Sequence, residues 1–131
     1  MSVLESIRDR IQSDDQDAPR TPTIDVDDAI DVLANERLRY ILDVLARVDD
    51  EIDKGELAEL VAAREYQTRI RHLTGQQRKR VYVALHQSTL PKLDGAGIIQ
   101  YDDPVVEPTD RITVLTDAKQ ALNESLRGAS A

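Results

Sequence analysis

Residues 73–102 read LTGQQRKRVYVALHQSTLPKLDGAGIIQYD and contain both the start and the end of one long helix. Thr74 followed by Gln77 is a capping-box pattern, in which each side chain binds a free backbone N–H group of the other residue. Gly95 or Gly97 then marks the helix end, because glycine readily takes the left-handed conformation of a helix stop. An apolar, β-branched run follows directly, so the stretch predicts a helix that leads into a strand.

The long helix begins with a basic string in a chain whose formal net charge is -8. Residues 78–80 are Arg-Lys-Arg, and no Asp or Glu occurs over residues 66–93. Because acidic residues are frequent in the rest of the chain, we expect this gap to have a function; ordinary solvation of an exposed helix face is the alternative. Pro91 lies inside the helical span and predicts a kink or break near residue 88, since proline removes one backbone hydrogen bond.

Two shorter helices are expected before the basic string. Asn35 is a predicted N-cap for a helix over residues 35–48, where apolar residues recur at helical spacing. Asp53 with Glu56 forms a second capping-box pattern, directly after an isolated strand residue at Ile52. The chain therefore offers three helices in succession, the third of them basic.

Two β-branched runs follow the long helix. IIQYDD at residues 98–103 and RITVLT at residues 111–116 read as the strands of a hairpin, and residues 117–126 read as a closing helix. Three helices, a hairpin and a last helix, in this order, predict a mostly α protein with a small β-hairpin (α+β). The expected fold is a winged helix-turn-helix with extra N-terminal and C-terminal helices.

Three segments are expected along the chain. Residues 1–12 form an amphipathic helix, residues 13–29 form a solvated linker rich in Asp and interrupted by proline, and residues 30–131 form the winged-helix domain with its C-terminal helix. The apolar stripes of the two terminal helices are candidates for homodimerisation, with packing on their own chain as the alternative; they contain Val3, Leu4, Ile7, Ile11, Leu122 and Leu126.

The composition limits the kinds of site and the cellular location that the sequence allows. The 131 residues include no Cys, which excludes disulfides and thiolate metal sites, and the start of the chain lacks the apolar core of a signal peptide. No apolar run approaches the length of a membrane span, so we expect a cytoplasmic protein that does not enter membranes. The excess of Asp suits concentrated salt, where charge repulsion is screened, and favours a halophilic source; an acidic mesophilic protein is the alternative.

Two stretches also carry a family resemblance. ELAELVAAREY, followed by the stretch quoted at the outset, resembles a haloarchaeal family of uncharacterised winged-helix domains over roughly residues 30–117. TLPKLDGAGIIQYD is similar to the passage from recognition helix to wing in many winged-helix regulators. The resemblance implies a DNA-binding transcription regulator of a halophilic archaeon.

Helical geometry suggests which side chains would touch DNA. With successive residues 100° apart, one side of the third helix packs and includes Tyr82 and His86, while the opposite side is free to enter the major groove. We expect Gln77, Arg80 and Gln87 to read bases, because Arg and Gln match the edges of guanine and adenine. Ser88 allows close approach, and phosphates would be held by the remaining cations, which are Arg78, Lys79, Arg69 and Arg71.

Other functions receive less support from the sequence. The two histidines lie in no metal-binding pattern, and no nucleophile or phosphate loop is recognisable, so we expect neither an enzyme nor a cofactor. The loop of the expected wing carries four acids and Arg111 as its one cation. Such a wing avoids the DNA backbone, reaches it through Arg111 alone, or contacts a protein. A protein-interaction winged helix is therefore the alternative to a regulator that binds double-stranded DNA.

Overall fold

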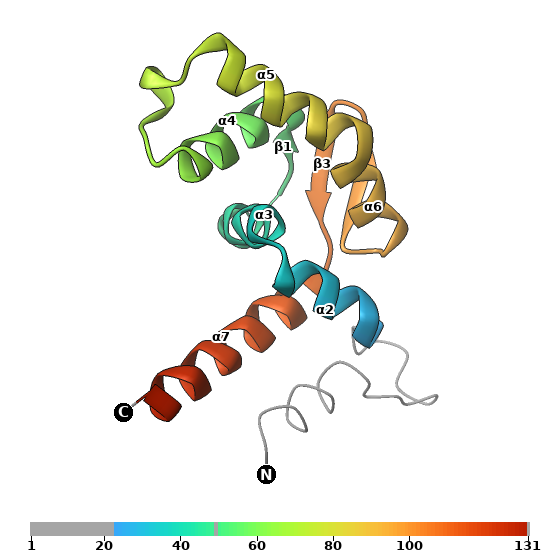
Figure 1. Ribbon diagram of the computed structural model, residues 1–131. Coiled ribbons are helices and arrows are strands. Elements are labelled where there is room, and N and C mark those ends of the chain that lie inside the picture. Colours follow the sequence, from blue (N-terminus) through green and yellow to red (C-terminus); the bar gives the residue numbers. More distant parts are fainter. Residues whose placement is uncertain (1–22, 49, 131) are drawn as a thin grey trace.

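The computed structural model describes residues 23–48 and 50–130 (Figure 1). The chain is mostly helical and carries a small antiparallel sheet, which confirms the predicted α+β winged-helix-like class. The elements are α2 (Val26–Ala34), α3 (Glu36–Arg47), β1 (Ile52–Asp53), α4 (Lys54–Glu65), the 3-10 turn η1 (Ile70–His72), α5 (Gly75–Ala84), the π-helical segment η2 (Leu85–Thr89), α6 (Leu90–Gly95), β2 (Ile99–Asp102), β3 (Val105–Pro108) and α7 (Arg111–Ser130).

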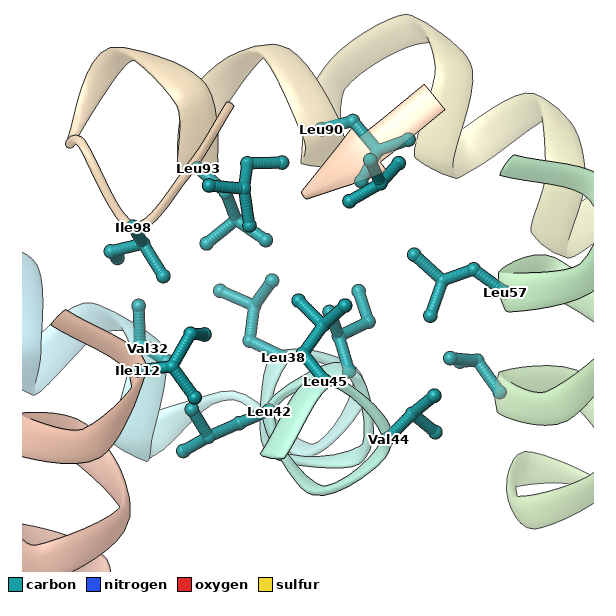
Figure 2. Close-up of a cluster of buried hydrophobic side chains, with 14 of the residues drawn as sticks. Val32, Leu38, Leu42, Val44, Leu45, Leu57, Leu90, Leu93, Ile98 and Ile112 are labelled. Atoms are coloured by element: carbon teal, nitrogen blue, oxygen red, sulfur yellow. The ribbon is translucent and has the colours of Figure 1, made fainter. Parts of the chain in front are cut away.

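Helix α3 lies at the centre of the fold. In Figure 1 it is seen end-on, with α4 and α5 on one side and α2 and α7 on the other. Figure 2 shows its side chains Leu38, Leu42 and Leu45 meeting side chains from the surrounding elements, including Leu57 of α4 and Ile112 of α7. Because a single core joins all these helices, the position of α5 relative to the sheet is fixed by packing.

The sheet includes the hairpin of β2 and β3, which we call the wing, and places it against α6; residues 102–105, which connect the two strands, are the wing turn. The strand order of the sheet is β1-β3-β2, and both pairs are antiparallel. The short strand β1 pairs Ile52 with Val106, as the isolated apolar residue between two helices predicts. A strand of this length has little stability of its own. It ties the start of α4 to the wing.

The predicted helix caps are confirmed. The Asn35 side chain accepts a hydrogen bond from the Leu38 N–H at the start of α3. At α5 both halves of the capping box form, since Thr74 Oγ1 accepts from the Gln77 N–H and Gln77 Oε1 accepts from the Thr74 N–H. Asp53 caps α4 by accepting from the Gly55 N–H at 2.8 Å, but only this half of the predicted Asp53–Glu56 capping box forms, because the Glu56 side chain does not bind the Asp53 N–H.

The long helix ends at Gly97, one of the two glycines expected there. Gly97 has a φ of 74°, and the Ile98 N–H donates to the Leu93 carbonyl while the Gly97 N–H donates to that of Asp94. This is a Schellman motif, and Ile98 and Leu93 add its usual apolar contact (Figure 2). A Cβ on Gly97 would overlap the Arg111 guanidinium, which would have to shift, so the positive φ is the main reason for glycine at this position.

The irregularity expected from Pro91 takes the form of a π-helical segment. Over Leu85–Thr89 the chain stays helical but widens, and the Leu90 N–H donates to the Leu85 carbonyl. Pro91 then occupies the first turn of α6, where its missing N–H costs little. Helical conformation is continuous from Gly75 to Gly95, so the long helix is widened at Leu85–Thr89 and not broken.

The linker prediction was wrong for the part of residues 13–29 that the structure describes. Helix α2 begins at Val26, with Asp25 as its N-cap, and both Ile24 and Ala29 are buried. Asp27 lies on the solvent side of this amphipathic helix, and the number of Asp residues in the sequence concealed its apolar face. Residues 1–22, including the N-terminal helix expected over residues 1–12, lie outside the described part.

The second strand of the hairpin was also misplaced. β3 is formed by Val105–Pro108, whereas the β-branched run RITVLT is the start of α7. Ile112, Leu115 and Ala118 are buried at helical spacing, and this spacing outweighs the β propensity of the individual residues. The wing is consequently shorter than expected, and the closing helix begins at residue 111 and not at residue 117.

Candidate nucleic-acid interface

Helix α5 and the following π segment present one exposed side to solvent. Val81 and Leu85 are fully buried and fix the opposite side in the core. We call the exposed side the outer face of α5; it consists of Gln76, Lys79, Arg80, Tyr82, His86 and Gln87. It contains no carboxylate, and within residues 23–48 and 50–130 neither Lys79 nor Arg80 forms an ion pair.

Tyr82 and His86 belong to the outer face, which corrects the prediction that they pack inward. Tyr82 is 39% exposed, and its ring is stacked on that of His86 with centroids 6.4 Å apart. The buried stripe is narrower than expected, because Val81 is the buried residue of α5 and Leu85 continues the stripe in η2. The outer face is therefore turned further toward the wing than the helical wheel suggested.

Two expected DNA contacts have partners inside the protein. Gln77 is half-buried, and its Oε1 serves the capping box. The Arg78 guanidinium forms an ion pair with Glu59 of α4 and donates from Nη2 to the Ile70 carbonyl at 2.9 Å. Both side chains thus stabilise the local structure. Gln87 and Arg80 remain exposed as expected.

The turn between α4 and α5 carries the other cations. Arg69 and Arg71 are exposed on either side of Ile70, whose carbonyl is held by Arg78. Arg64, which the sequence places near this patch, instead donates to Asp43 of α3 at 3.1 Å. The turn therefore presents two exposed arginines from a backbone that is fixed to α5. Ser88 is exposed too, and its Oγ donates to the Ala84 carbonyl at 3.2 Å.

Lys54 links the outer face to the wing. It is 3% exposed and is the only buried charged side chain among the described residues. Its Nζ lies 2.6 Å from Oδ1 of Asp103 in the wing turn and 3.0 Å from Nδ1 of His86. Because an ammonium group only donates, the His86 nitrogen accepts. The ammonium also lies 5.0 Å from the centre of the Tyr82 ring, within cation–π range.

The pKa values of Lys54 and Asp103 shift in the directions expected for two opposite charges in contact. The hydrogen bond to Asp103 raises the pKa of Lys54 above its ordinary value, and this effect outweighs the burial that opposes it. The same hydrogen bond lowers the pKa of the Asp103 carboxyl. Sequence reasoning missed Lys54. One signal was available, since a lysine in the first turn of a helix opposes the helix dipole and needs another stabilising partner.

The wing offers no exposed cation among the described residues. Asp102 and Glu107 are exposed, and Arg111 lies away from the wing in the first turn of α7. The Arg111 Nε donates to the Thr23 carbonyl at 2.5 Å, and Nη1 donates to the Gly97 carbonyl at 3.2 Å. Of the three alternatives for the wing, contact through Arg111 loses its support, because this side chain joins the segment just before α2 to the turn after α6.

An open groove borders the outer face on its α4 side. It runs between the first turns of α4 and α5 and places carboxylates of Asp53, Glu56 and Glu59 beside Arg78 and Lys79. Acidic side chains thus lie next to one margin of the outer face. Within residues 23–48 and 50–130, no cluster of three or more metal-binding side chains occurs, and no helix there is long and apolar enough to cross a membrane.

One comparison with known proteins gives a match. A family model described as "Domain of unknown function (DUF7344)" matches residues 30–106, which is more than half of the chain. The matched range contains α3, α4, α5 and most of the wing, and so includes Lys54, Asp103 and the whole outer face; α7 lies beyond it. No curated protein and no solved structure is significantly similar to the chain.

Proposed function

The chain belongs to the DUF7344 family, and we propose that it is a sequence-specific DNA-binding transcription regulator of a halophilic archaeon. In this proposal α5 enters the major groove with its outer face toward the bases. The observation that carries the proposal is the outer face itself. In a chain of net charge -8, an exposed helix side with Lys79 and Arg80 and without any carboxylate is well suited to a polyanion.

The positions of the side chains suggest a division of roles. Arg80 is placed to donate to guanine, and Gln76 and Gln87 are placed to pair with adenine. The stacked rings of Tyr82 and His86 offer apolar surface for a thymine methyl group. Lys79, Arg69 and Arg71 would hold phosphates. Compared with the sequence-based assignment, Gln76 replaces Gln77 as a base reader, because Gln77 is occupied by its cap.

High salt favours base reading over phosphate contacts. The affinity that comes from neutralising phosphates falls steeply as salt concentration rises. In the cytoplasm of a halophile, hydrogen bonds to base edges and close fit must therefore supply more of the binding free energy. Arg80 and the two glutamines of the outer face should matter more at molar KCl than the arginines of the α4–α5 turn.

We place a homodimer in the same proposal, with α7 as the contact. In Figure 1 the C-terminal half of α7 extends away from the rest of the domain. Its buried stripe continues from Leu115 and Ala118 to the half-buried Leu122. If the α7 helices of two subunits paired in antiparallel orientation with Leu122 at the centre, Asp117 would lie beside Arg127 of the partner subunit. A monomeric mass in light scattering at molar KCl would contradict this part of the proposal.

A protein-interaction module is the second candidate, and the groove beside α4 favours it. The carboxylates of Asp53 and Glu56, which form no ion pair with any described residue, would repel a phosphate backbone that approached from that side. A basic segment of a protein partner would find these charges and the exposed Asp102 complementary. The two functions differ in the role of Arg80, which a basic partner would not need.

The deciding experiment is selection of bound fragments from randomised and halophile genomic DNA at molar KCl. The wild type, a Lys79→Ala/Arg80→Ala variant and an Arg47→Ala variant are run in parallel. Arg47 is exposed at the end of α3, outside the outer face, and is the matched control. A motif recovered by the wild type and the control but not by the double variant supports the proposal. No enrichment by any of the folded proteins overturns it in favour of the interaction module.

A further inference from the structure

The wing turn contains two neighbouring carboxylates with different surroundings. Asp102 is exposed and forms no ion pair with any described residue. Asp103 is also largely accessible, with 53% of its side chain exposed, but Oδ1 lies 2.6 Å from the buried Lys54 ammonium. The two residues carry the same charge at the same end of the wing. Only one of them has a counter-charge within the protein.

Lys54 holds the wing through its backbone as well as its side chain. Its N–H donates to the Pro104 carbonyl at 2.8 Å, next to the Asp103 residue that its Nζ binds. The same Nζ contacts His86 of the outer face. On the wing side, the Tyr101 ring centre lies 5.9 Å from the ammonium, and the Tyr101 hydroxyl lies 3.5 Å from the His86 ring nitrogen. One side chain thus joins α4, the wing turn and the outer face.

On the basis of the proposed function, we propose that Lys54 is the positioning residue that fixes the wing turn against the outer face of α5, and that Asp103 is its anchor. A buried ammonium requires a partner, and the wing supplies it. The pair also cancels one of the two negative charges at the wing turn. The wing turn can then lie beside DNA with Asp102 as its one carboxylate that has no counter-charge among the described residues.

The two carboxylates give a matched test, since Asp102→Asn and Asp103→Asn remove the same charge one residue apart. If the wing acts only through its charge, both variants should bind DNA more tightly, each by about threefold, because one repulsive charge is gone. If Asp103 is the anchor, the variants should move in opposite directions. Asp102→Asn should bind about threefold more tightly, and Asp103→Asn about tenfold more weakly, because the wing turn is no longer held.

The affinity is measured at several KCl concentrations on the fragment that the wild type selects. Because the described wing residues include no exposed cation, losing wing contacts should not change counterion release. Asp103→Asn should therefore lower the affinity at every KCl concentration, and both variants should keep the slope of log affinity against log salt within one contact of the wild type. Tighter binding by both variants would overturn the proposal.

A second measurement needs no DNA and separates this proposal from the proposed function. Amide hydrogen exchange reports local opening, and the Lys54 and Val106 amides report the β1–β3 edge of the wing. Asp103→Asn and Lys54→Met should each speed their exchange about tenfold, and the double variant should add little to either, as expected for partners in one interaction. Asp102→Asn should leave exchange unchanged. Equal exchange in all variants would overturn the positioning role, even if the protein binds no DNA.

Discussion

The outer face of α5 and the wing turn show opposite relations between charge and partners. On the outer face, Lys79 and Arg80 are exposed and form no ion pair within the described residues. At the wing turn, Asp103 is anchored to a lysine that is almost completely buried. A charge that is satisfied inside the protein contributes to structure, whereas an exposed and unpaired charge is available to a partner. The comparison shows that the position of each charge, and not the net charge of -8, decides what this surface can bind.

The largest expected effect tests the exposed cations of the outer face, which form no ion pair with any described residue. Arg80→Ala should weaken binding to the selected fragment by about 1–3 kcal/mol, roughly 5- to 150-fold, and relax the preference at one base position. Arg78→Ala is the matched control, because it removes the same group from a side chain that is bound to Glu59 and Ile70. Titrations by fluorescence anisotropy measure both. Equal losses of affinity for the two variants would remove the distinction between the outer face and the inner side of α5.

The next effect tests how firmly the wing is joined to the long helix. Gly97→Ala should lower the free energy of unfolding by about 2 kcal/mol, because alanine at positive φ is strained and its Cβ would displace the Arg111 guanidinium. Gly95→Ala, two residues earlier, is the control, since a Cβ there meets nothing within 4 Å. That variant should be neutral or slightly more stable. Urea unfolding measures both, and a stable Gly97→Ala protein would show that the junction tolerates rearrangement.

A smaller effect separates capping from base reading. Gln77→Ala should cost about 0.5–1 kcal/mol of unfolding free energy, because half of the capping box is lost, and should leave DNA preference unchanged. Gln87→Ala should leave the unfolding free energy unchanged and should alter DNA preference, since Gln87 is exposed and lies on the outer face. A change in base preference on Gln77→Ala would return Gln77 to the role that its position in the sequence suggested.

The sequence predicted features that depend on neighbouring residues better than those that depend on distant ones. The caps at Asn35, Asp53 and Thr74 and the stop at Gly97 follow from a few adjacent residues, and all are confirmed. The start of α7 was missed because β-branched residues were read by propensity, while their burial against α3 decided the outcome.

At the candidate site, too, local features could be predicted and contacts between distant residues could not. The exposure of Arg80 and Gln87 could be predicted from the periodicity of one helix. The partner of Arg78 lies on α4, and the partner of Lys54 is separated from it by 49 residues. No local pattern contains such contacts. A helical wheel also leaves the width of the buried stripe undetermined, which is why Tyr82 and His86 were assigned to the wrong side.

The smallest expected effect is on stability, and it isolates the anchored carboxylate. Because the pKa of Asp103 is lowered in the folded protein, its contribution is present above the usual Asp pKa of about 3.9 and is lost as pH falls through the lower folded value. Because the pKa of Lys54 is raised in the folded protein, the contribution of its charge to stability is fully present below about pH 10.

The difference in unfolding free energy between the wild type and Asp103→Asn should therefore shrink as the pH falls below about pH 4, where the Asp103 carboxylate takes up a proton. Urea unfolding at pH values above and below this point measures it, with Asp102→Asn as the control for removal of a neighbouring charge. Since Asp103 is partly exposed, solvent screens the pair and the difference will be modest. If both variants had the unfolding free energy of the wild type at every pH, Asp102 and Asp103 would be equivalent charges. The wing turn and the outer face would then differ only in the sign of their charges.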